Sequence, residues 1–256
     1  MTLCICGVVL IYGDFAYLYD RLMHDVDYKQ WADYVEAICM RSGLRPRLIA
    51  DLGCGTGSFC LEMSQKGYEM IGVDQSAEML SCARQKALDS GADILFLNQD
   101  MTRFELYGTV DVITSLMDSV NYVTYKRDLR RFFKLAANYL NPGGLFIFDI
   151  NTPFKFNSIL SNNTFGETDQ DVAYVWQNCF DSGTRLCRFD LTFFVSEGDR
   201  YRRFDEVQYE RCYEKEELSE MLAAVGFKTL SVYDALRFRK PPQDCERMFF
   251  VCKKAG

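Results

Sequence analysis

Asp51-Leu52-Gly53-Cys54-Gly55-Thr56-Gly57 is the stretch that decides the fold of this chain. It follows a short apolar run at residues 48–50 and precedes a helical pattern over residues 59–66. Glycines at such a strand-to-helix turn let the backbone bend sharply and approach a ligand closely. Asp74 ends the next apolar run, where a carboxylate can accept both hydroxyls of a ribose. The two elements together indicate an adenosine-containing ligand in a βαβ unit.

Outward from this turn, short apolar runs alternate with amphipathic helical patterns. The runs at residues 70–73, 94–97, 110–116, 145–150, 227–234 and 247–252 are predicted to be strands. Ser76 is a good N-cap for the helix that Gly91 closes. This alternation predicts an α/β fold: a Rossmann-like, seven-stranded, mostly parallel sheet with helices on both faces. Its ligand crevice is expected beyond the carboxyl ends of the strands.

A different rhythm begins after Asn151. Polar and apolar residues alternate with a period of two, and Asp181-Ser182-Gly183 and Glu197-Gly198-Asp199 are turn signals between such runs. The pattern predicts a small antiparallel β insertion over about residues 172–211, after the fifth strand. A helix with apolar residues on one face follows and stops at Gly226.

The composition excludes several classes of protein. The chain has 256 residues, 48% hydrophobic and 25% charged, which fits one globular domain. Its net charge of −7 argues against a nucleic-acid partner and against a polybasic membrane anchor. Eleven scattered cysteines without a CxxC pair, and a single histidine, predict no metal site. We interpret the cysteines as reduced thiols of a cytoplasmic protein.

The apolar residues 1–11 are too few to span a bilayer and lack the features of a signal peptide. We expect either a core-packing strand or an extension from an early start codon, and no contact with a membrane.

The identity of the ligand stays open from spacing alone. A dinucleotide-binding loop prefers G-x-G-x-x-G/A, whereas here the third glycine, Gly57, comes one position early and Ser58 follows it. A nicotinamide dinucleotide and another adenosine-containing cofactor are both compatible with this loop.

In its ordered motifs the chain resembles the class I S-adenosylmethionine-dependent methyltransferases. The stretch from Asp51 to Gly57 matches the first motif of that family at every position. Four further segments resemble its later motifs in order: Gly72-Val73-Asp74-Gln75-Ser76, Gln99-Asp100-Met101, Ser115-Leu116-Met117-Asp118-Ser119-Val120-Asn121-Tyr122 and Leu140-Asn141-Pro142-Gly143-Gly144.

The resemblance implies S-adenosyl-L-methionine as cofactor and assigns its contacts. It implies that Asp74 binds the ribose, Asp100 the adenine amino group, and Met101 the side of the ring. Asp51 would act through backbone and water contacts on the methionine ammonium, or cap the glycine loop. The cofactor-binding residues expected are Tyr12, Tyr19, Asp51, Gly53, Cys54, Gly55, Gly57, Asp74, Gln75, Met79, Asp100, Met101, Ser115 and Leu116.

A second resemblance concerns the N-terminal segment Tyr12-Gly13-Asp14-Phe15-Ala16-Tyr17-Leu18-Tyr19-Asp20. It is similar to that of a small-molecule subgroup which includes glycine and amino-sugar N-methyltransferases, and the antiparallel insertion resembles theirs. This implies methyl transfer to a small-molecule acceptor, with nitrogen favoured over oxygen. The expected single domain (1–256) then comprises an N-terminal lid and helix (1–46), a cofactor-binding core (47–150), an insertion over the acceptor site (151–213) and a closing segment (214–256).

The catalytic candidates are fewer, because an amine nucleophile only needs to lose a proton. Asp118, Asn121 and Tyr122 follow the fourth strand, where groups facing the acceptor converge, and His24 is the one imidazole available as a base. Three arginines (Arg202, Arg203 and Arg211) could hold a substrate carboxylate, but a strand face of solvated charges is the preferred interpretation.

Three rival functions remain. Tyr122 and Lys126 have the Tyr-x-x-x-Lys spacing of short-chain dehydrogenases, although they come too soon after the fourth strand. A nucleic-acid methyltransferase, including one that modifies tRNA, is opposed by the acidic charge and by the lack of [DN]-P-P-[YF] after that strand. The third is a non-catalytic partner protein with a cofactor fold. A homodimer is left open, because no motif determines the oligomeric state.

Overall fold

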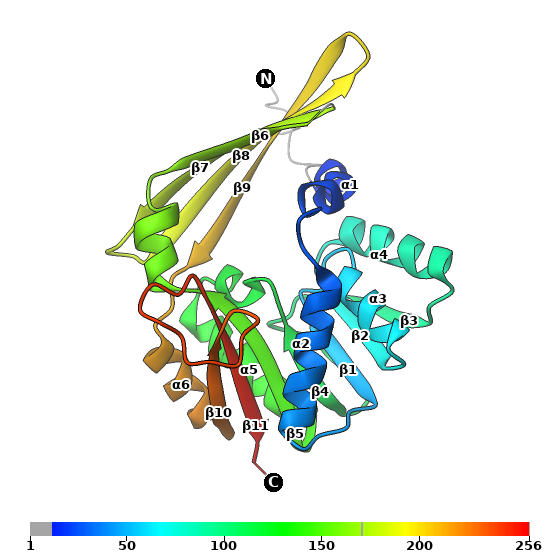
Figure 1. The fold of residues 1–256 in the computed structure, drawn as a ribbon, viewed down its shortest axis with the longest axis vertical. Helices are drawn as coiled ribbons and strands as arrows, with labels where there is room; N and C mark the ends of the chain where they lie inside the picture. The colour runs from blue at the N-terminus through cyan, green and yellow to red at the C-terminus, as the bar shows by residue number, and fades with distance from the viewer. Residues whose placement is uncertain (1–11, 170, 256) are drawn as a thin grey trace, which may run out of the picture.

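Two β-sheets and their covering helices make up the molecule (Figure 1), a computed structural model that describes residues 12–169 and 171–255. The strand or extension predicted for residues 1–11 lies outside the described residues. No helix in the described residues is long and apolar enough to cross a membrane.

The larger sheet has seven strands in the order β10-β11-β5-β4-β1-β2-β3. Their bounds are β1 Leu48–Leu52, β2 Glu69–Asp74, β3 Ile94–Asn98, β4 Val110–Ser115, β5 Leu140–Asn151, β10 Phe227–Asp234 and β11 Arg247–Lys254. Strands β1 to β5 pair in parallel, and only β11 runs antiparallel to its neighbours β5 and β10. The prediction of a seven-stranded, mostly parallel sheet is confirmed.

Helices cover both faces of this sheet, as predicted. The apolar sides of α2 (Tyr28–Arg41), α3 (Ser58–Gln65) and α4 (Ala77–Ser90) pack on one face, and those of α5 (Lys126–Tyr139) and α6 (Lys215–Ala224) pack on the other. The Ser76 side chain caps α4 by accepting from the Met79 amide at 3.1 Å, and Gly91 ends that helix in the left-handed region.

The second sheet is the antiparallel insertion, with the strand order β6-β7-β8-β9. Its strands are β6 Thr164–Thr168, β7 Val172–Asp181, β8 Leu186–Glu197 and β9 Arg200–Arg211. The predicted range of residues 172–211 covers β7 to β9. Strand β6 was missed because it is largely exposed and shows no alternation, and so was the helical turn η2 (Lys155–Leu160) before it.

Helix α1 (Tyr12–Leu22) lies between the two sheets. Ala16 of α1 packs with Met79 of α4 and Phe193 of β8 in one small apolar cluster, so that α1 joins the body of the molecule to the insertion (Figure 1).

Candidate active site

The glycine turn after β1 brings three distant segments into contact. Gly53 has φ of +80°, and a Cβ placed there would lie 2.8 Å from Ser119 Oγ and 2.9 Å from Met101 Cε. Gly57 has φ of +73° and would meet Ala83 of α4 and Phe96 of β3. Gly53 therefore permits close approach of the Met101 and Ser119 side chains to the turn, whereas Gly57 permits close packing against α4 and β3.

The Asp74 carboxylate joins this turn to the start of α4. Its Oδ2 accepts from the Gly55 amide at 2.8 Å, and its Oδ1 accepts from the Ser76 amide at 2.9 Å. Each carboxylate oxygen has a second lone pair. Asp74 can therefore still accept hydrogen bonds from a vicinal diol in the space beside Gly55, where no atom would meet a Cβ within 4 Å.

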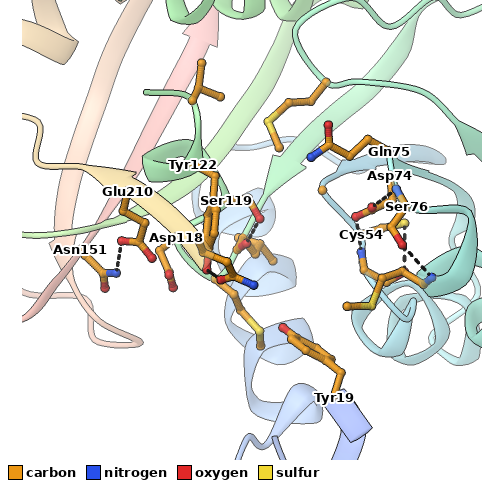
Figure 2. A pocket seen from close by; sticks show the side chains of 18 of the residues that line it. Tyr19, Cys54, Asp74, Gln75, Ser76, Asp118, Ser119, Tyr122, Asn151 and Glu210 are labelled. Carbon is orange, nitrogen blue, oxygen red and sulfur yellow. Dashed lines mark hydrogen bonds between the residues drawn. The ribbon is translucent and has the colours of Figure 1, made fainter. Parts of the chain in front are cut away.

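A cavity with a volume of about 800 Å³ begins at this turn and continues to the inner face of the insertion. Figure 2 shows Cys54, Asp74, Gln75 and Ser76 on one side of it and Asp118, Tyr122, Asn151 and Glu210 on the other, with Tyr19 between them. We call these sides the cofactor half and the acceptor half. The expected cofactor residues that line the cavity are Tyr19, Asp51, Gly53, Cys54, Gly55, Asp74, Gln75, Met79, Asp100, Met101 and Leu116.

Two of the expected cofactor residues that the structure describes do not line this cavity. Ser115 is fully buried at the end of β4, beneath the cavity wall, and Gly57 faces α4 and β3. The side chain of Tyr12 lies outside the described residues.

Asp51 and Asp100 occupy different environments in the cofactor half. Asp100 is partly exposed, and its Oδ1 accepts from the Thr102 amide at 2.7 Å in a local turn. Asp51 is buried and its Oδ1 accepts from Thr114 Oγ1 at 2.7 Å. Burial raises the pKa of Asp51 from its ordinary value of 3.8 to about 7.

This pKa shift predicts how stability depends on pH. The folded protein keeps the Asp51 proton between about pH 4 and about pH 7, whereas the unfolded chain has released it, so the contribution of Asp51 to stability falls as pH rises. The side chain of Asp51→Asn cannot titrate. The free energy of unfolding of this variant relative to that of wild type is therefore expected to increase as pH rises through that window. Urea unfolding at several pH values measures the difference, and parallel profiles for the two proteins would contradict the shift.

Helix α1 is fastened to the cofactor half by Asp20. Its carboxylate accepts from Thr56 Oγ1 at 2.6 Å and from Lys86 Nζ at 2.8 Å, and Lys86 also donates to Ser58 Oγ at 2.7 Å. The glycine turn, α3 and α4 are thereby joined to the helix that carries Tyr19.

Asp20→Ala should weaken the attachment of α1 to the cofactor half. Loss of net interactions of about 0.5–1.5 kcal/mol corresponds to a roughly 2–10-fold faster dissociation of a bound adenosyl ligand. Stopped-flow fluorescence with S-adenosylhomocysteine measures the rate. Asp25→Ala, an exposed carboxylate that pairs only with its neighbour His24 among the ion pairs of the described chain, is the control and should match wild type.

The exit of the fourth strand has an unusual backbone. Met117 and Asp118 are both in the left-handed region, with φ of 56° and 55°, which is costly for residues with a Cβ. Both amides donate to the buried Asp149 carboxylate, at 2.7 and 3.0 Å, and Arg247 pairs with Asp149 and with Asp118. This network fixes the turn that points Asp118 into the acceptor half.

The catalytic candidates separate into two groups. Asp118 and Tyr122 line the cavity, and Tyr122 is 44% exposed while its hydroxyl donates to Gln208 Oε1 at 2.9 Å. Asn121 is fully buried and bonds the Arg211 carbonyl and the Asn151 amide, so it ties the turn to β9 and β5. His24 lies away from the cavity lining on an exposed turn and contacts Asp25. Asn121 therefore stabilises the turn after β4, and His24 lies on the surface.

Two of the three arginines of the insertion follow the preferred interpretation, whereas Arg211 is half-buried and donates to the Thr124 carbonyl at 3.3 Å. Arg203 pairs with Asp205 at 2.8 Å and Arg202 with Glu197 at 2.8 Å, on exposed parts of β8 and β9. Lys126 pairs with Glu217 of α6, so the Tyr122 and Lys126 side chains do not form the pair that a dehydrogenase would use.

Sequence reasoning missed the remainder of the acceptor half. Glu210, Asn151 and Lys155 line it together with aromatic and apolar side chains of the insertion: Tyr174, Trp176, Phe189, Leu191 and Phe193. The alternation in β9 places Glu206, Gln208 and Glu210 on one face, but only the packed structure shows that this face is the inner one.

Known proteins are similar to this chain in sequence and in fold. A family model described as a methyltransferase domain matches residues 49–144. The chain is 37% identical to YqeM of Bacillus subtilis (strain 168) over 247 residues, which is 96% of this chain and 98% of that protein. It is 35% identical to the crystal structure of an S-adenosylmethionine-dependent methyltransferase from Clostridium acetobutylicum ATCC 824, with a TM-score of 0.88 over 96% of this chain and 100% of that one. The chain belongs to the class I S-adenosylmethionine-dependent methyltransferases.

The methyltransferase also resembles more distant structures in fold. Its TM-score with the sugar N-methyltransferase KedS8 from Streptoalloteichus sp ATCC 53650 is 0.78 at 20% identity, covering 100% of this chain and 98% of that one. Because the chain belongs to this enzyme family, the glycine turn is no longer interpreted as that of a dehydrogenase or of a non-catalytic partner protein.

Proposed function

We propose that this methyltransferase transfers a methyl group from S-adenosyl-L-methionine to a nitrogen atom of a small molecule. The observation that carries the proposal is the single cavity, whose cofactor half contains the motif residues and whose acceptor half is enclosed by the insertion. The similarity in fold to a sugar N-methyltransferase supports the same class of acceptor.

The residues of the cofactor half fit this ligand. Asp74 would hold the ribose hydroxyls, Asp100 the adenine amino group, and Met101 the side of the ring, while the space beside Gly55 admits the ligand backbone. Tyr19 contributes an aromatic face, and contact of such a face with a cation is worth about 0.5–2 kcal/mol. When bound, the cofactor supplies the electrophilic methyl carbon, so the chain's own contribution is orientation, exclusion of water and proton transfer.

Hydrogen-bond polarity in the acceptor half favours nitrogen. Tyr122 has a single hydroxyl proton and donates it to Gln208, so its oxygen is left to accept from the substrate. Asp118 and Glu210 line the same half. A protonated or neutral amine offers several N–H donors to these groups, whereas an alcohol offers one.

The test is transfer of labelled methyl from S-adenosyl-L-methionine to a panel of primary amines, alcohols, carboxylates and tRNA. Transfer to amines supports the proposal. Transfer to tRNA alone would establish the nucleic-acid alternative, and transfer to alcohols alone would move the acceptor atom to oxygen.

A further inference from the structure

A buried carboxyl group stands at the wall of the acceptor half without an assigned role. Glu210 of β9 is 2% exposed and lines the cavity next to Asp118, which comes from the other sheet (Figure 2). The two carboxyl groups thus reach the same place from segments that are far apart in the chain, Glu210 from β9 and Asp118 from the turn after β4.

The orientation of Glu210 is determined by a short chain of donors. Lys155 Nζ, which can only donate, contacts Asn151 Oδ1 at 2.9 Å. The Asn151 amide group must therefore point its Nδ2 the other way, and it donates to Glu210 Oε2 at 2.9 Å. Oε2 thus accepts from Asn151, and the Glu210 carboxyl group also shares a hydrogen bond with Asp118, which a substrate amine would replace.

Burial and the charges around Glu210 favour its neutral form over the carboxylate. Burial and the neighbouring Asp118 carboxylate raise the pKa of Glu210 well above its usual range. Asp118 is held by Arg247 at 2.7 Å. The other titratable groups that face Glu210 are Tyr122 from the turn after β4, Lys155 from η2 and Cys187, its cross-strand partner on β8.

We infer that Glu210 is the catalytic residue that removes the proton from the acceptor nitrogen, that Asp118 is its charged neighbour, and that the acceptor is an amine carried on an aromatic or apolar body. The inference rests on the proposed function and deepens it. The amine end would lie against Glu210, Asp118 and the Tyr122 hydroxyl, and the body would lie against the aromatic inner face of the insertion.

Protons and charge are conserved in the proposed methyl transfer. An ammonium enters, and its positive charge stabilises the carboxylate form of Glu210, which therefore releases its proton to solvent. Glu210 then takes one proton from the ammonium nitrogen, because its buried site favours the neutral acid. The freed lone pair forms the N–C bond to the methyl carbon as the S–C bond breaks, and the bonding pair stays on sulfur. The products are a methylated ammonium and a thioether, Glu210 is again neutral, and one proton in total has been released.

Calorimetry on the intact protein tests this balance without turnover. The protein is saturated with S-adenosylhomocysteine and titrated at pH 7 with phenethylamine, a protonated amine on an aromatic body, in two buffers of different ionisation enthalpy. We expect release of about one proton per amine bound, and at least tenfold weaker binding of phenethyl alcohol and of phenylpropionate. Binding without proton release, or equal binding or no binding of the three probes, would overturn the inference.

Glu210→Gln is the matched variant, since it preserves shape and an acceptor for Asn151 but cannot take a proton. We expect unchanged affinity for S-adenosylhomocysteine, no proton release, and methylation of phenethylamine reduced by about 10²–10⁴-fold at pH 7. The lost rate should return as pH rises and free amine becomes available in solution. Asp205→Asn, on the outer face of the same strand and paired with Arg203, is the control and should behave as wild type.

The outcomes separate this inference from the proposed function. Failure of S-adenosylhomocysteine to bind wild type would count against both. Normal ligand binding with full activity of Glu210→Gln, or a pH profile parallel to that of wild type, would overturn only the role of Glu210.

Discussion

Asp74→Ala should raise the dissociation constant for S-adenosyl-L-methionine at least tenfold. The carboxylate is expected to form charge-assisted hydrogen bonds to the ribose, each worth about 1.5–3 kcal/mol, which corresponds to roughly 10–150-fold in affinity. Asp74 also accepts from the Gly55 and Ser76 amides, so the alanine variant loses the group that holds the turn in its binding shape. Isothermal titration calorimetry measures the constant directly.

Two comparisons make this result specific. Asp74→Asn keeps one oxygen that can accept from a backbone amide, and it should fall between wild type and alanine. Asp93→Ala removes an exposed carboxylate just before β3, at the opposite edge of the sheet, and should leave the affinity unchanged. Unchanged affinity in Asp74→Ala would show that the ribose assignment is wrong.

Arg247→Met is expected to be the most destabilising of the substitutions considered. Asp149 is fully buried and Arg247 pairs with it and with Asp118, so removing the cation leaves a carboxylate in the core without its partner. Breaking a buried ion pair in this way typically costs about 3–5 kcal/mol. The free energy of unfolding from urea titration at neutral pH gives the value.

Arg203→Met supplies the control for this loss. Arg203 pairs with Asp205 on the exposed face of the insertion, and exposed pairs contribute about 0–1 kcal/mol. Similar losses in the two variants would mean that the Asp149–Arg247 pair does not support the left-handed turn at Met117 and Asp118. The turn matters for function because it directs Asp118 into the acceptor half.

Local patterns were sufficient for the cofactor half. The turn from Asp51 to Gly57, the N-cap at Ser76 and the carboxylate at Asp74 each depend on backbone conformation or hydrogen bonds within a few residues or between adjacent parallel strands. Parallel strands place their carboxyl ends on one edge, so residues that follow β1, β2 and β3 meet without further information. These were the residues that spacing and family resemblance identified.

The acceptor half could not be assigned in the same way. Asn121 was predicted as a catalytic candidate because it follows the fourth strand, but its side-chain amide binds the Arg211 carbonyl and the Asn151 amide. His24 was predicted as a candidate base because it carries the one imidazole of the sequence, but it lies on an exposed turn. Glu210 is 59 residues from Asn151, and nothing in the pattern of β9 shows that they touch.

The sequence by itself determined the α/β sheet and the ligand turn, because those features depend on hydrophobic period, glycine conformation and short-range order along parallel strands. The class of cofactor came from the resemblance of five ordered motifs to a known family. The tertiary structure alone decided which face of the insertion turns inward and which carboxyl groups share the acceptor half. The physical reason is that alternation in a strand defines two faces but not their destinations. The packing of β7, β8 and β9 against the body buries one face, and burial is what gives Glu210 its different chemistry.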